Sequence, residues 1–256
     1  MAAIALHPVK SASARSVQTC RVGPTGITDD RRWMVVDSVG DMLTAREIPP
    51  LLRVVADTPL TAPGLDAPLR LRFPGLESLS IDGSPGEQRS AQVFGRAVRV
   101  DVVHQAAGWL QEALGLGGVQ LVRHLAHPGE RAALQDAAAV SITTTASLQQ
   151  VSSWADDDLA PSRFRGNLLL SGDIEPFAED AWTTVRIGDD VVLSARKPIS
   201  RCLLTTIDPD DLTSGPEPLR SLARHHRIDG TPRFGLGLHV VHGGEISLGD
   251  RVTLER

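Results

Sequence analysis

Cysteine is scarce in this chain: its 256 residues include Cys20 and Cys202 and no other cysteine. Two cysteines exclude a disulfide-stapled scaffold and a four-cysteine iron–sulfur or zinc site. Long hydrophobic runs are also lacking, because no stretch reaches the roughly 18 to 20 apolar residues of a membrane-spanning helix. The N-terminal stretch has no basic residues ahead of its short apolar segment, which Pro8 and Lys10 then interrupt, so it is a poor signal peptide. The sequence therefore predicts a cytoplasmic protein with no membrane partner.

An excess of positive charge is lacking too. Lys and Arg number 26 against 31 Asp and Glu, for a formal net charge of -5. General nucleic-acid binding requires a basic surface, so we expect no nucleic-acid partner, although a local basic pocket remains compatible with this balance. Hydrophobic residues make up 41% of the chain and charged residues 22%, which suits a folded core in one large domain or two packed smaller ones.

Three common catalytic and nucleotide-binding motifs are missing. No GxGxxG, GxxxxGK[ST] or GxSxG sequence occurs, so Rossmann, P-loop and α/β-hydrolase folds have no support. The segment HVVHGGE resembles a metal site, but His239 and His242 fall in a predicted strand, where positions three apart point to opposite faces. We interpret them as surface or turn histidines. The same interpretation applies to two further pairs, His124 with His127 and His225 with His226.

The apolar segments are mostly of strand length. Gly (23) and Pro (17) interrupt the chain often, and segments such as LRLRF and AVRVDVV alternate apolar with polar residues, as half-buried antiparallel strands do. Leu51–Ala56 and Leu203–Ile207 are among the predicted strands. Helices are predicted at three places: Gln105–Leu114, Thr145–Trp154 and Glu217–Arg227. This pattern predicts a mostly β (α+β) fold of antiparallel, barrel-like sheets with few helices, rather than a doubly wound sheet.

The segment Gly115–Gly118 (GLGG) follows the first predicted helix and is the best place for a boundary between two halves. We therefore predict a smaller N-terminal domain over residues 1–115 and a second domain over residues 116–256.

Candidate chemistry lies where cationic side chains stand beside small hydroxyl residues. The stretches are Pro8–Ser11 (PVKS), Asp30–Trp33 (DRRW), Phe164–Asn167 (FRGN) and Ser200–Pro209 (SRCLLTTIDP). Guanidinium, ammonium and hydroxyl donors together recognise phosphate and other oxyanions. Cys202 adds a soft donor directly after an arginine, which favours the thiolate form that binds soft metals or attacks electrophiles. A buried structural cysteine is the alternative for Cys202 taken alone.

These stretches, in this order, resemble the MOSC family, named for the C-terminal domain of molybdenum cofactor sulfurase. The resemblance is closer to its two-part members, which join a MOSC N-terminal β-barrel domain to the MOSC domain, as the mitochondrial amidoxime-reducing component and its bacterial relatives do. It covers nearly the whole chain. Besides the stretches above, it rests on GITDDRRWMVVD from Gly26, TAREIP from Thr44, RFGLGL from Arg233 and ISLGDRVTL from Ile246.

The resemblance implies a molybdenum cofactor, with Cys202 as the protein's ligand to the metal and a catalytic residue. It further implies that the pterin and its phosphate are bound by Lys10, Ser11, Arg31, Thr144, Arg165, Asn167, Ser200 and Arg201. Thr144, which opens a helix, fits less securely than the others. Asp208 is a second catalytic candidate and Thr205 a supporting one, both chosen for their proximity to Cys202 in the sequence.

The implied activity is reduction of N-hydroxylated small molecules, such as hydroxylamines and amidoximes, by a molybdenum-dependent oxidoreductase. We expect electrons to come from a separate protein of the ferredoxin or flavoprotein reductase type, because two cysteines cannot hold an iron–sulfur cluster. The resemblance also implies pyridoxal phosphate binding, which is an attribute of family members that carry a desulfurase domain. No such domain is visible in this sequence.

Two other functions stay open at this stage. In one, the chain is a molybdenum cofactor carrier or sulfur-transfer protein in which Cys202 carries a persulfide. In the other, it is a small-molecule binding module that has lost its chemistry.

Overall fold

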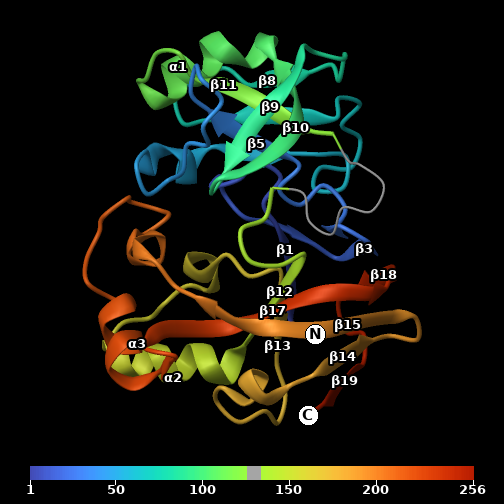
Figure 1. Cartoon of the computed structure of the whole chain (residues 1–256), viewed down its shortest axis with the longest axis vertical. Helices are drawn as coiled ribbons and strands as arrows, with labels where there is room; N and C mark the ends of the chain where they lie inside the picture. Colours follow the sequence, from blue (N-terminus) through green and yellow to red (C-terminus); the bar gives the residue numbers. More distant parts are fainter. Residues whose placement is uncertain (126–133) are drawn as a thin grey trace. The chain divides into compact units, whose positions relative to one another are not determined.

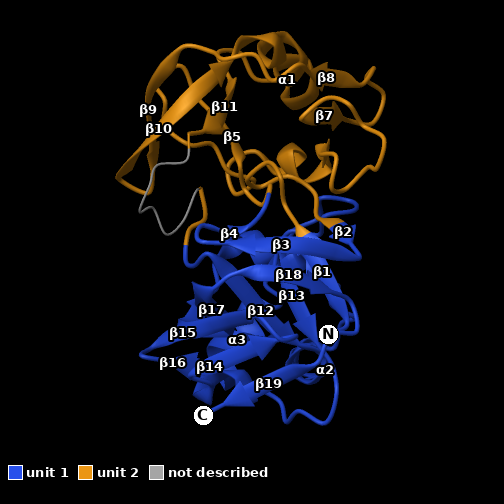
Figure 2. Ribbon diagram, turned by 90° about the vertical axis from the view of Figure 1, so that its right-hand side faces the viewer, with its two compact units in different colours: residues 1–5, 16–28, 137–256 blue, residues 6–15, 29–136 orange. Residues whose placement is uncertain are grey.

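The computed structural model describes residues 1–125 and 134–256, which form two compact units. Unit 1 contains residues 1–5, 16–28 and 137–256, and unit 2 contains residues 6–15 and 29–136. Figure 2 colours the two units separately. Both units draw on both sides of residue 115, since the first strands of the chain pack with residues 137–256. A single cut after residue 115 therefore stays a prediction.

Unit 1 is organised around one long sheet, whose strand order is β19-β14-β15-β17-β12-β13-β1-β2, with β16 pairing to β17 (Figure 1). Leu6 and Arg15, at the ends of β1 and β2, are counted with unit 2. Neighbouring strands run antiparallel at each junction from β19 to β12, whereas β12 and β13 run parallel. The strands are β1 (Ala3–Leu6), β2 (Arg15–Val17), β12 (Val140–Thr144), β13 (Leu168–Leu170), β14 (Thr184–Ile187), β15 (Val191–Ser200), β16 (Arg227–Ile228), β17 (Thr231–His242) and β19 (Val252–Glu255).

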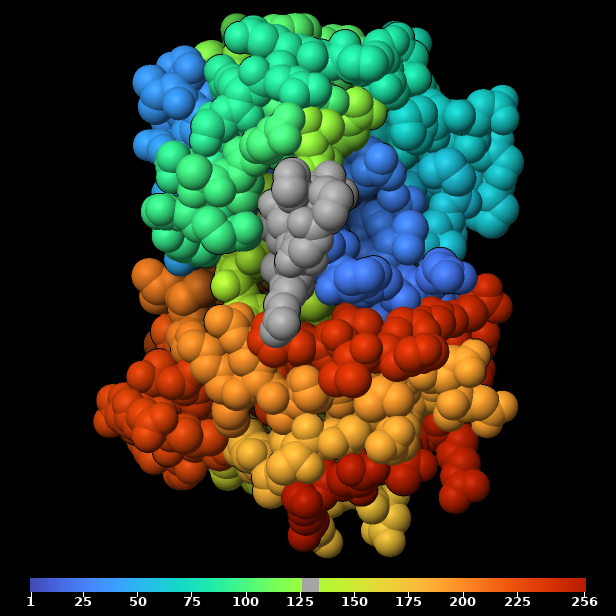
Figure 3. Space-filling model, turned by 45° about the vertical axis from the view of Figure 1, so that its right-hand side comes forward, coloured from blue at the N-terminus to red at the C-terminus, as the bar shows by residue number. Residues whose placement is uncertain are grey.

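A second, smaller sheet of unit 1 has the order β18-β3-β4 and is antiparallel. Its strands are β3 (Thr19–Gly23), β4 (Gly26–Ile27) and β18 (Gly244–Ser247). In the space-filling view, the orange residues of β15 lie beside the red residues of β17 on the surface of this unit, in agreement with their pairing (Figure 3).

Helices α2 (Thr145–Ala155) and α3 (Leu219–His225) pack with the large sheet of unit 1. Helix α2 begins where the Thr144 side chain accepts a hydrogen bond from the Ser147 amide, at 3.1 Å, which satisfies one of the free N–H groups of the first turn. The apolar core between these elements contains residues from both helices, from β17 and from the segment between α2 and β13: Val151, Leu159, Phe164, Leu222 and Phe234.

Unit 2 contains two antiparallel sheets and helix α1 (Ala107–Leu114). The first sheet has the order β5-β11-β10-β9, and the second has the order β6-β7-β8. Alternate residues of β10 pack into a core that includes Val98, Val100 and Val102. The strands are β5 (Trp33–Val36), β6 (Val55–Asp57), β7 (Leu69–Arg72), β8 (Leu79–Ile81), β9 (Gln88–Val93), β10 (Arg96–Val103) and β11 (Gln120–His124).

Short 3-10 helices connect these elements. They are η1 (Pro49–Arg53), η2 (His104–Ala106), η3 (Pro161–Phe164), η4 (Ala178–Ala181) and η5 (Leu203–Thr206). Two predicted strands are therefore wrong in whole or part. Leu203–Ile207 is mostly the helical turn η5, and the first half of Leu51–Ala56 lies in η1.

The prediction of a mostly β fold with antiparallel-rich sheets and few helices is confirmed. The three predicted helical segments correspond to η2 with α1, to α2 and to α3. Among the described residues, no helix combines the length and the apolar character needed to cross a membrane.

Gly235 in β17 provides a test of how tightly this sheet is packed. Its φ is +72°, and a Cβ built there would lie 2.6 Å from the carbonyl oxygen of Ile142. We expect Gly235→Ala to lower the free energy of unfolding by on the order of 2 kcal/mol, since strained backbone and a backbone clash combine. Gly117→Ala is the matched control, because nothing lies within 4 Å of its added carbon. Chemical denaturation of both variants is the measurement, and equal stabilities would contradict the expectation.

Candidate functional site

Cys202 lies at the junction of β15 and η5, and it is exposed, whereas Cys20 is buried. Its backbone is extended, and its carbonyl oxygen accepts hydrogen bonds from the Thr205 amide (3.1 Å) and the Thr205 hydroxyl (3.0 Å). The Thr206 hydroxyl donates to the Leu203 carbonyl in the same way, at 2.8 Å. These hydroxyls close the turn η5 directly after the thiol. An exposed thiol contradicts the alternative of a buried structural cysteine.

Arg201 fixes the other side of Cys202. Its guanidinium donates from Nε and Nη2 to the Phe234 carbonyl, at 2.9 and 2.6 Å, and from Nη1 to the Phe164 carbonyl, at 2.8 Å. The guanidinium carbon also lies 5.6 and 5.7 Å from the centres of the Phe164 and Phe234 rings, within the range of cation–π attraction. The structure thus joins three of the sequence motifs, SRC, FRGN and RFGLGL, at one side chain. Arg201 acts here as a positioning residue.

The other predicted binding residues of unit 1 have different surroundings. Ser200 is exposed and Arg165 is half-buried. Asn167 is buried; its Oδ1 accepts from the Ser141 amide (3.1 Å) and hydroxyl (3.0 Å), and its Nδ2 donates to the Ala5 carbonyl (3.2 Å). These bonds tie β12, β13 and β1 together, which gives Asn167 a structural role in the sheet.

Thr144 is fully buried. Its hydroxyl lies 2.7 Å from the Ser147 hydroxyl and 3.4 Å from a carboxylate oxygen of Glu179. The structure therefore uses Thr144 as the cap of α2, and a role for it in binding a cofactor stays a prediction.

Asp208 follows η5 and forms an ion pair with Arg163 of η3, with 2.6 Å between its Oδ2 and Nη2 of the arginine. A hydrogen bond from the Asp210 amide to Oδ1, at 2.8 Å, together with Arg163, holds the pKa of Asp208 below its usual value. A carboxylate that stays ionised is unsuited to donate a proton at neutral pH. The contacts make Asp208 a positioning residue that joins η3 to the turn after η5.

Lys10 of unit 2 is buried, with 5% of its surface exposed. Its ammonium donates to the Leu134 carbonyl at 3.0 Å, forms an ion pair with Asp136, and lies 5.5 Å from the centre of the Phe94 ring. Ser11 beside it is also buried and has a positive φ of 67°. The predicted phosphate-binding ammonium thus already has a carboxylate partner.

Arg31 pairs with Asp30, its neighbour in the sequence, through Nη1 and Oδ2. Asp30 also accepts the His7 amide at 2.8 Å, and the His7 ring lies 3.7 Å away. Burial opposes the ionisation of Asp30, but the charge of Arg31 and the interactions with His7 outweigh it and hold the pKa of Asp30 well below its usual range. Backbone bonds from Lys10 to Trp33 (2.8 Å) and from Arg31 to His7 (2.9 Å) bring the PVKS and DRRW stretches together.

Sequence reasoning missed several partners of these residues, among them Arg163, Asp136 and Phe94. Phe94 is 54% exposed, in the turn between β9 and β10, and the guanidinium of Arg46 lies 5.1 Å from its ring centre. Of the partners described above, Asp30 could have been found from the sequence, because it is a carboxylate directly before Arg31. The other partners are distant in sequence and have no local pattern.

The interpretation as surface or turn histidines is wrong for two of the histidines. His124 is buried in β11, and His226 is half-buried and lies 2.8 Å from a carboxylate oxygen of Asp180. His242 is exposed, as expected.

His239 and His242 fall in strand β17, and His242 Nδ1 is 2.8 Å from the Asp190 carbonyl. In the part of the chain that the structure describes, no group of three or more His, Cys, Asp or Glu side chains is arranged to hold a metal ion. His127 lies outside the described residues.

Comparison of the sequence with protein-family models identifies the family of this chain. The model of the MOSC N-terminal beta barrel domain matches residues 1–116, and the model of the MOSC domain matches residues 129–253. The chain belongs to the MOSC family. It is a two-part member with both of the family's domains, as the order of its motifs implied.

Two kinds of relative match this MOSC protein over most of its length. "Mitochondrial amidoxime-reducing component 1" of Danio rerio is 32% identical over 88% of this chain and 74% of the relative. The protein of that name from Mus musculus is 28% identical over 97% and 80%, respectively. "Molybdenum cofactor sulfurase" of Anopheles gambiae is 30% identical over 93% of this chain but only 34% of the relative.

Among solved structures, the YUAD protein of Bacillus subtilis aligns with 98% of this chain and 91% of its own. The TM-score is 0.48 and the sequence identity is 10%. This likeness is too weak to bear on function.

The buried Asp30 carboxylate yields a prediction of stability against pH. Because its pKa is lower in the folded than in the unfolded chain, its contribution is present above the unfolded value of about 3.9 and is lost as pH falls below it. We expect Asp30→Asn to lower the free energy of unfolding by about 3 kcal/mol at pH 7, because the ion pair of the buried carboxylate with Arg31 is lost. The difference from wild type, measured by urea denaturation, is expected to shrink below about pH 4. A difference that grows at acid pH would contradict this assignment.

The contacts of Arg201 yield a second prediction. Lysine has no planar fork and cannot bond two carbonyls while stacking on two rings, so Arg201→Lys is expected to lower the free energy of unfolding by about 2 kcal/mol. Arg196→Lys is the matched control, since Arg196 is an exposed residue of the same strand. Thermal and urea denaturation provide the measurement. Equal stability of the two variants would show that Arg201 does not organise this region.

Proposed function

We propose that this MOSC protein is a molybdenum-cofactor-dependent oxidoreductase that reduces N-hydroxylated small molecules, such as hydroxylamines and amidoximes. The exposed thiol of Cys202, presented between the Arg201 contacts and the closed turn η5, is the observation that carries the proposal. Its support from relatives is the similarity to amidoxime-reducing components over most of their length. Reduction of a hydroxylamine consumes two electrons and two protons and yields the amine and water.

The donor set fits such a cofactor by its chemistry. A thiolate is a soft ligand of the kind that molybdenum accepts beside the two sulfurs of a pterin dithiolene, and Cys202 is accessible. The exposed hydroxyl of Ser200 and the half-buried Arg165 offer polar donors in the same unit. In unit 2, the cations of Lys10 and Arg31 have the chemistry that binds a phosphate. When bound, the cofactor supplies the two-electron redox chemistry.

The chain's own residues then divide into two groups. We propose that Cys202 holds the metal, and that Lys10, Ser11, Arg31, Arg165 and Ser200 contact the pterin or its phosphate. Asn167, Thr144, Arg201 and Asp208 act through other residues, because their side chains are engaged in the protein's own contacts. Asp208 in particular is proposed to hold the turn after Cys202 and not to transfer a proton.

We also propose a separate electron-donor protein, of the ferredoxin or flavoprotein reductase type, and a cytoplasmic location. Neither the matched domains nor the names of the relatives support pyridoxal phosphate binding, so that expectation is dropped.

A sulfur-transfer or cofactor-carrier function is the second candidate. The same exposed thiol suits a persulfide, and the chain is 30% identical to a molybdenum cofactor sulfurase over 93% of its length. The two candidates differ in what Cys202 carries: a metal in the oxidoreductase, a transferable sulfur atom in the carrier.

The decisive variant is Cys202→Ala, produced in a host with an intact molybdenum cofactor pathway. We expect it to fold as wild type does, because the side chain is exposed, and to lose reduction of benzamidoxime with an artificial electron donor. Cys20→Ala is the matched control, since Cys20 is buried in β3 and its loss leaves the exposed thiol intact. Activity that persists in Cys202→Ala would remove Cys202 from the reaction.

Metal and sulfur analysis of the wild-type protein separates the two candidates. Stoichiometric molybdenum together with reductase activity supports the oxidoreductase. Cyanide-releasable sulfur that disappears in Cys202→Ala, in protein without molybdenum, supports the carrier.

A further inference from the structure

A buried carboxylate in unit 2 is surrounded by three arginines. Asp57, at the end of β6, is 1% exposed in its side chain and lies 2.8 Å from Nη2 of Arg15, 3.2 Å from Nη2 of Arg70 and 2.8 Å from Nε of Arg72. Arg70 and Arg72 come from β7, which pairs with β6 so that Asp57 lies opposite Arg70. The side chains of the three arginines are 29%, 36% and 45% exposed. The guanidinium groups are therefore accessible to solvent, whereas the carboxylate is not.

The charges of this arginine cluster (Arg15, Arg70 and Arg72) do not balance. Across residues 1–125 and 134–256, Asp57 is the one carboxylate that forms an ion pair with any of the three arginines. One negative charge thus faces three positive charges that are always present at neutral pH, because arginine does not deprotonate in proteins. Guanidinium groups held together around one carboxylate repel one another, and this repulsion favours a further anion at their exposed edges.

The hydrogen-bond donors of the cluster also exceed its acceptors. The Nε atoms of Arg15 and Arg70 are buried, and neither has an acceptor among the described residues; Oδ1 of Asp57 also has no hydrogen bond, although Nη2 of Arg15 lies 2.8 Å from it. Each guanidinium carries five N–H donors, whereas one carboxylate accepts about four hydrogen bonds, so the donors of three arginines outnumber the acceptor sites of Asp57. The remaining donors point to a second oxyanion.

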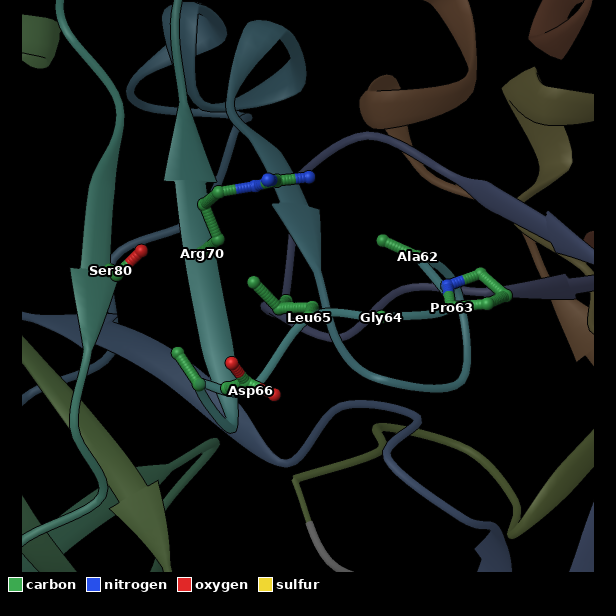
Figure 4. Close-up of a pocket in the computed structure, with 8 residues that line it drawn as sticks. Ala62, Pro63, Gly64, Leu65, Asp66, Arg70 and Ser80 are labelled. Atoms are coloured by element: carbon green, nitrogen blue, oxygen red, sulfur yellow. The ribbon is translucent and has the colours of Figure 1, made fainter.

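A hollow of about 460 Å³ lies next to the cluster and is lined by Arg70, by Ser80 of β8 and by the loop of residues 62–67. Figure 4 shows the Arg70 side chain extending from its strand near this loop, which carries Leu65 and Asp66. A hollow of this size suits a small organic molecule. Asp66 is exposed there, so its carboxylate disfavours a second negative charge on the body of the molecule.

We propose that Arg15, Arg70 and Arg72 form a binding site for the single oxyanion group, carboxylate or phosphate, of a small molecule whose remaining part is uncharged or cationic and occupies the adjoining hollow. The site is formed within unit 2 and uses none of the residues assigned to the molybdenum cofactor. It therefore stands independently of the proposed function.

Titration of the full-length wild-type protein tests the site directly. The Nε–H resonances of the arginines are followed by NMR while inorganic phosphate, phenyl phosphate or benzoate is added at constant ionic strength. We expect saturable shifts for Arg15, Arg70 and Arg72, tighter binding of phenyl phosphate than of inorganic phosphate, and no shift for Arg53, an exposed arginine of η1 in the same unit. Saturation by phosphate compounds alone or by benzoate as well identifies which oxyanion the site takes. Shifts that chloride reproduces, or the absence of saturable shifts, would overturn the proposal.

A variant pair provides the second measurement. The double variant Arg70→Gln, Arg72→Gln is expected to bind phenyl phosphate at least about tenfold more weakly, because two charged donors are lost. Arg53→Gln is the matched control and is expected to bind as wild type does. Unchanged affinity in a folded double variant would place the binding elsewhere. Since the wild-type titration reads each arginine individually, the proposal stays testable if the double variant does not fold.

Discussion

The presentation of Cys202 depends on the contacts of one guanidinium. Arg201 bonds the carbonyls of Phe164 and Phe234 and stacks on both rings, so the end of β15 is held to η3 and to β17 directly before the thiol. A guanidinium is suited to this task because its planar fork bonds carbonyls in its plane and attracts rings at its faces. The next residue, Cys202, is exposed, and the hydroxyls of Thr205 and Thr206 close the chain into η5 on its other side. The exposed sulfur thus lies between two segments that the protein's own contacts hold in place.

Unit 2 uses the opposite arrangement, in which arginines are gathered by buried carboxylates. Asp30 holds Arg31 and the His7 segment, and Asp57 holds one arginine from the N-terminal segment and two from β7. Burial raises the cost of ionising each carboxylate, yet the pKa of both is lowered, because the surrounding cations and hydrogen bonds outweigh that cost. Removing Asp57 leaves three guanidinium groups facing one another, and removing Asp30 breaks the buried ion pair with Arg31. These buried carboxylates therefore position cationic side chains. A sequence motif can identify such a cation, but it does not show which carboxylate holds it.

The parts of the fold that the sequence predicted well are those encoded locally. Helix α2 was predictable because Thr144 precedes an apolar periodicity, and β10 because its residues alternate. The segment Leu203–Ile207 was predicted as a strand from its apolar and β-branched residues, but two threonine hydroxyls bond back to carbonyls three residues earlier and favour a helical turn. At the site, the family motifs marked Cys202 and the cations beside it. They did not show that Asn167 and Thr144 are occupied inside the protein, because the partners Ser141, Ala5 and Glu179 are distant in sequence.

The sequence shows which residues are cationic, but it does not show whether a carboxylate of the protein already pairs with each cation. Lys10, Arg31 and Arg163 each have a carboxylate partner within the protein, so an incoming anion must compete with that partner or share the cation with it. The cluster at Asp57 differs, because three guanidiniums share one carboxylate and present their free surface to solvent. A sequence counts these arginines as equivalent. The balance of charge within each cluster, which only the folded chain defines, distinguishes cations that hold the protein together from cations that are left over for binding.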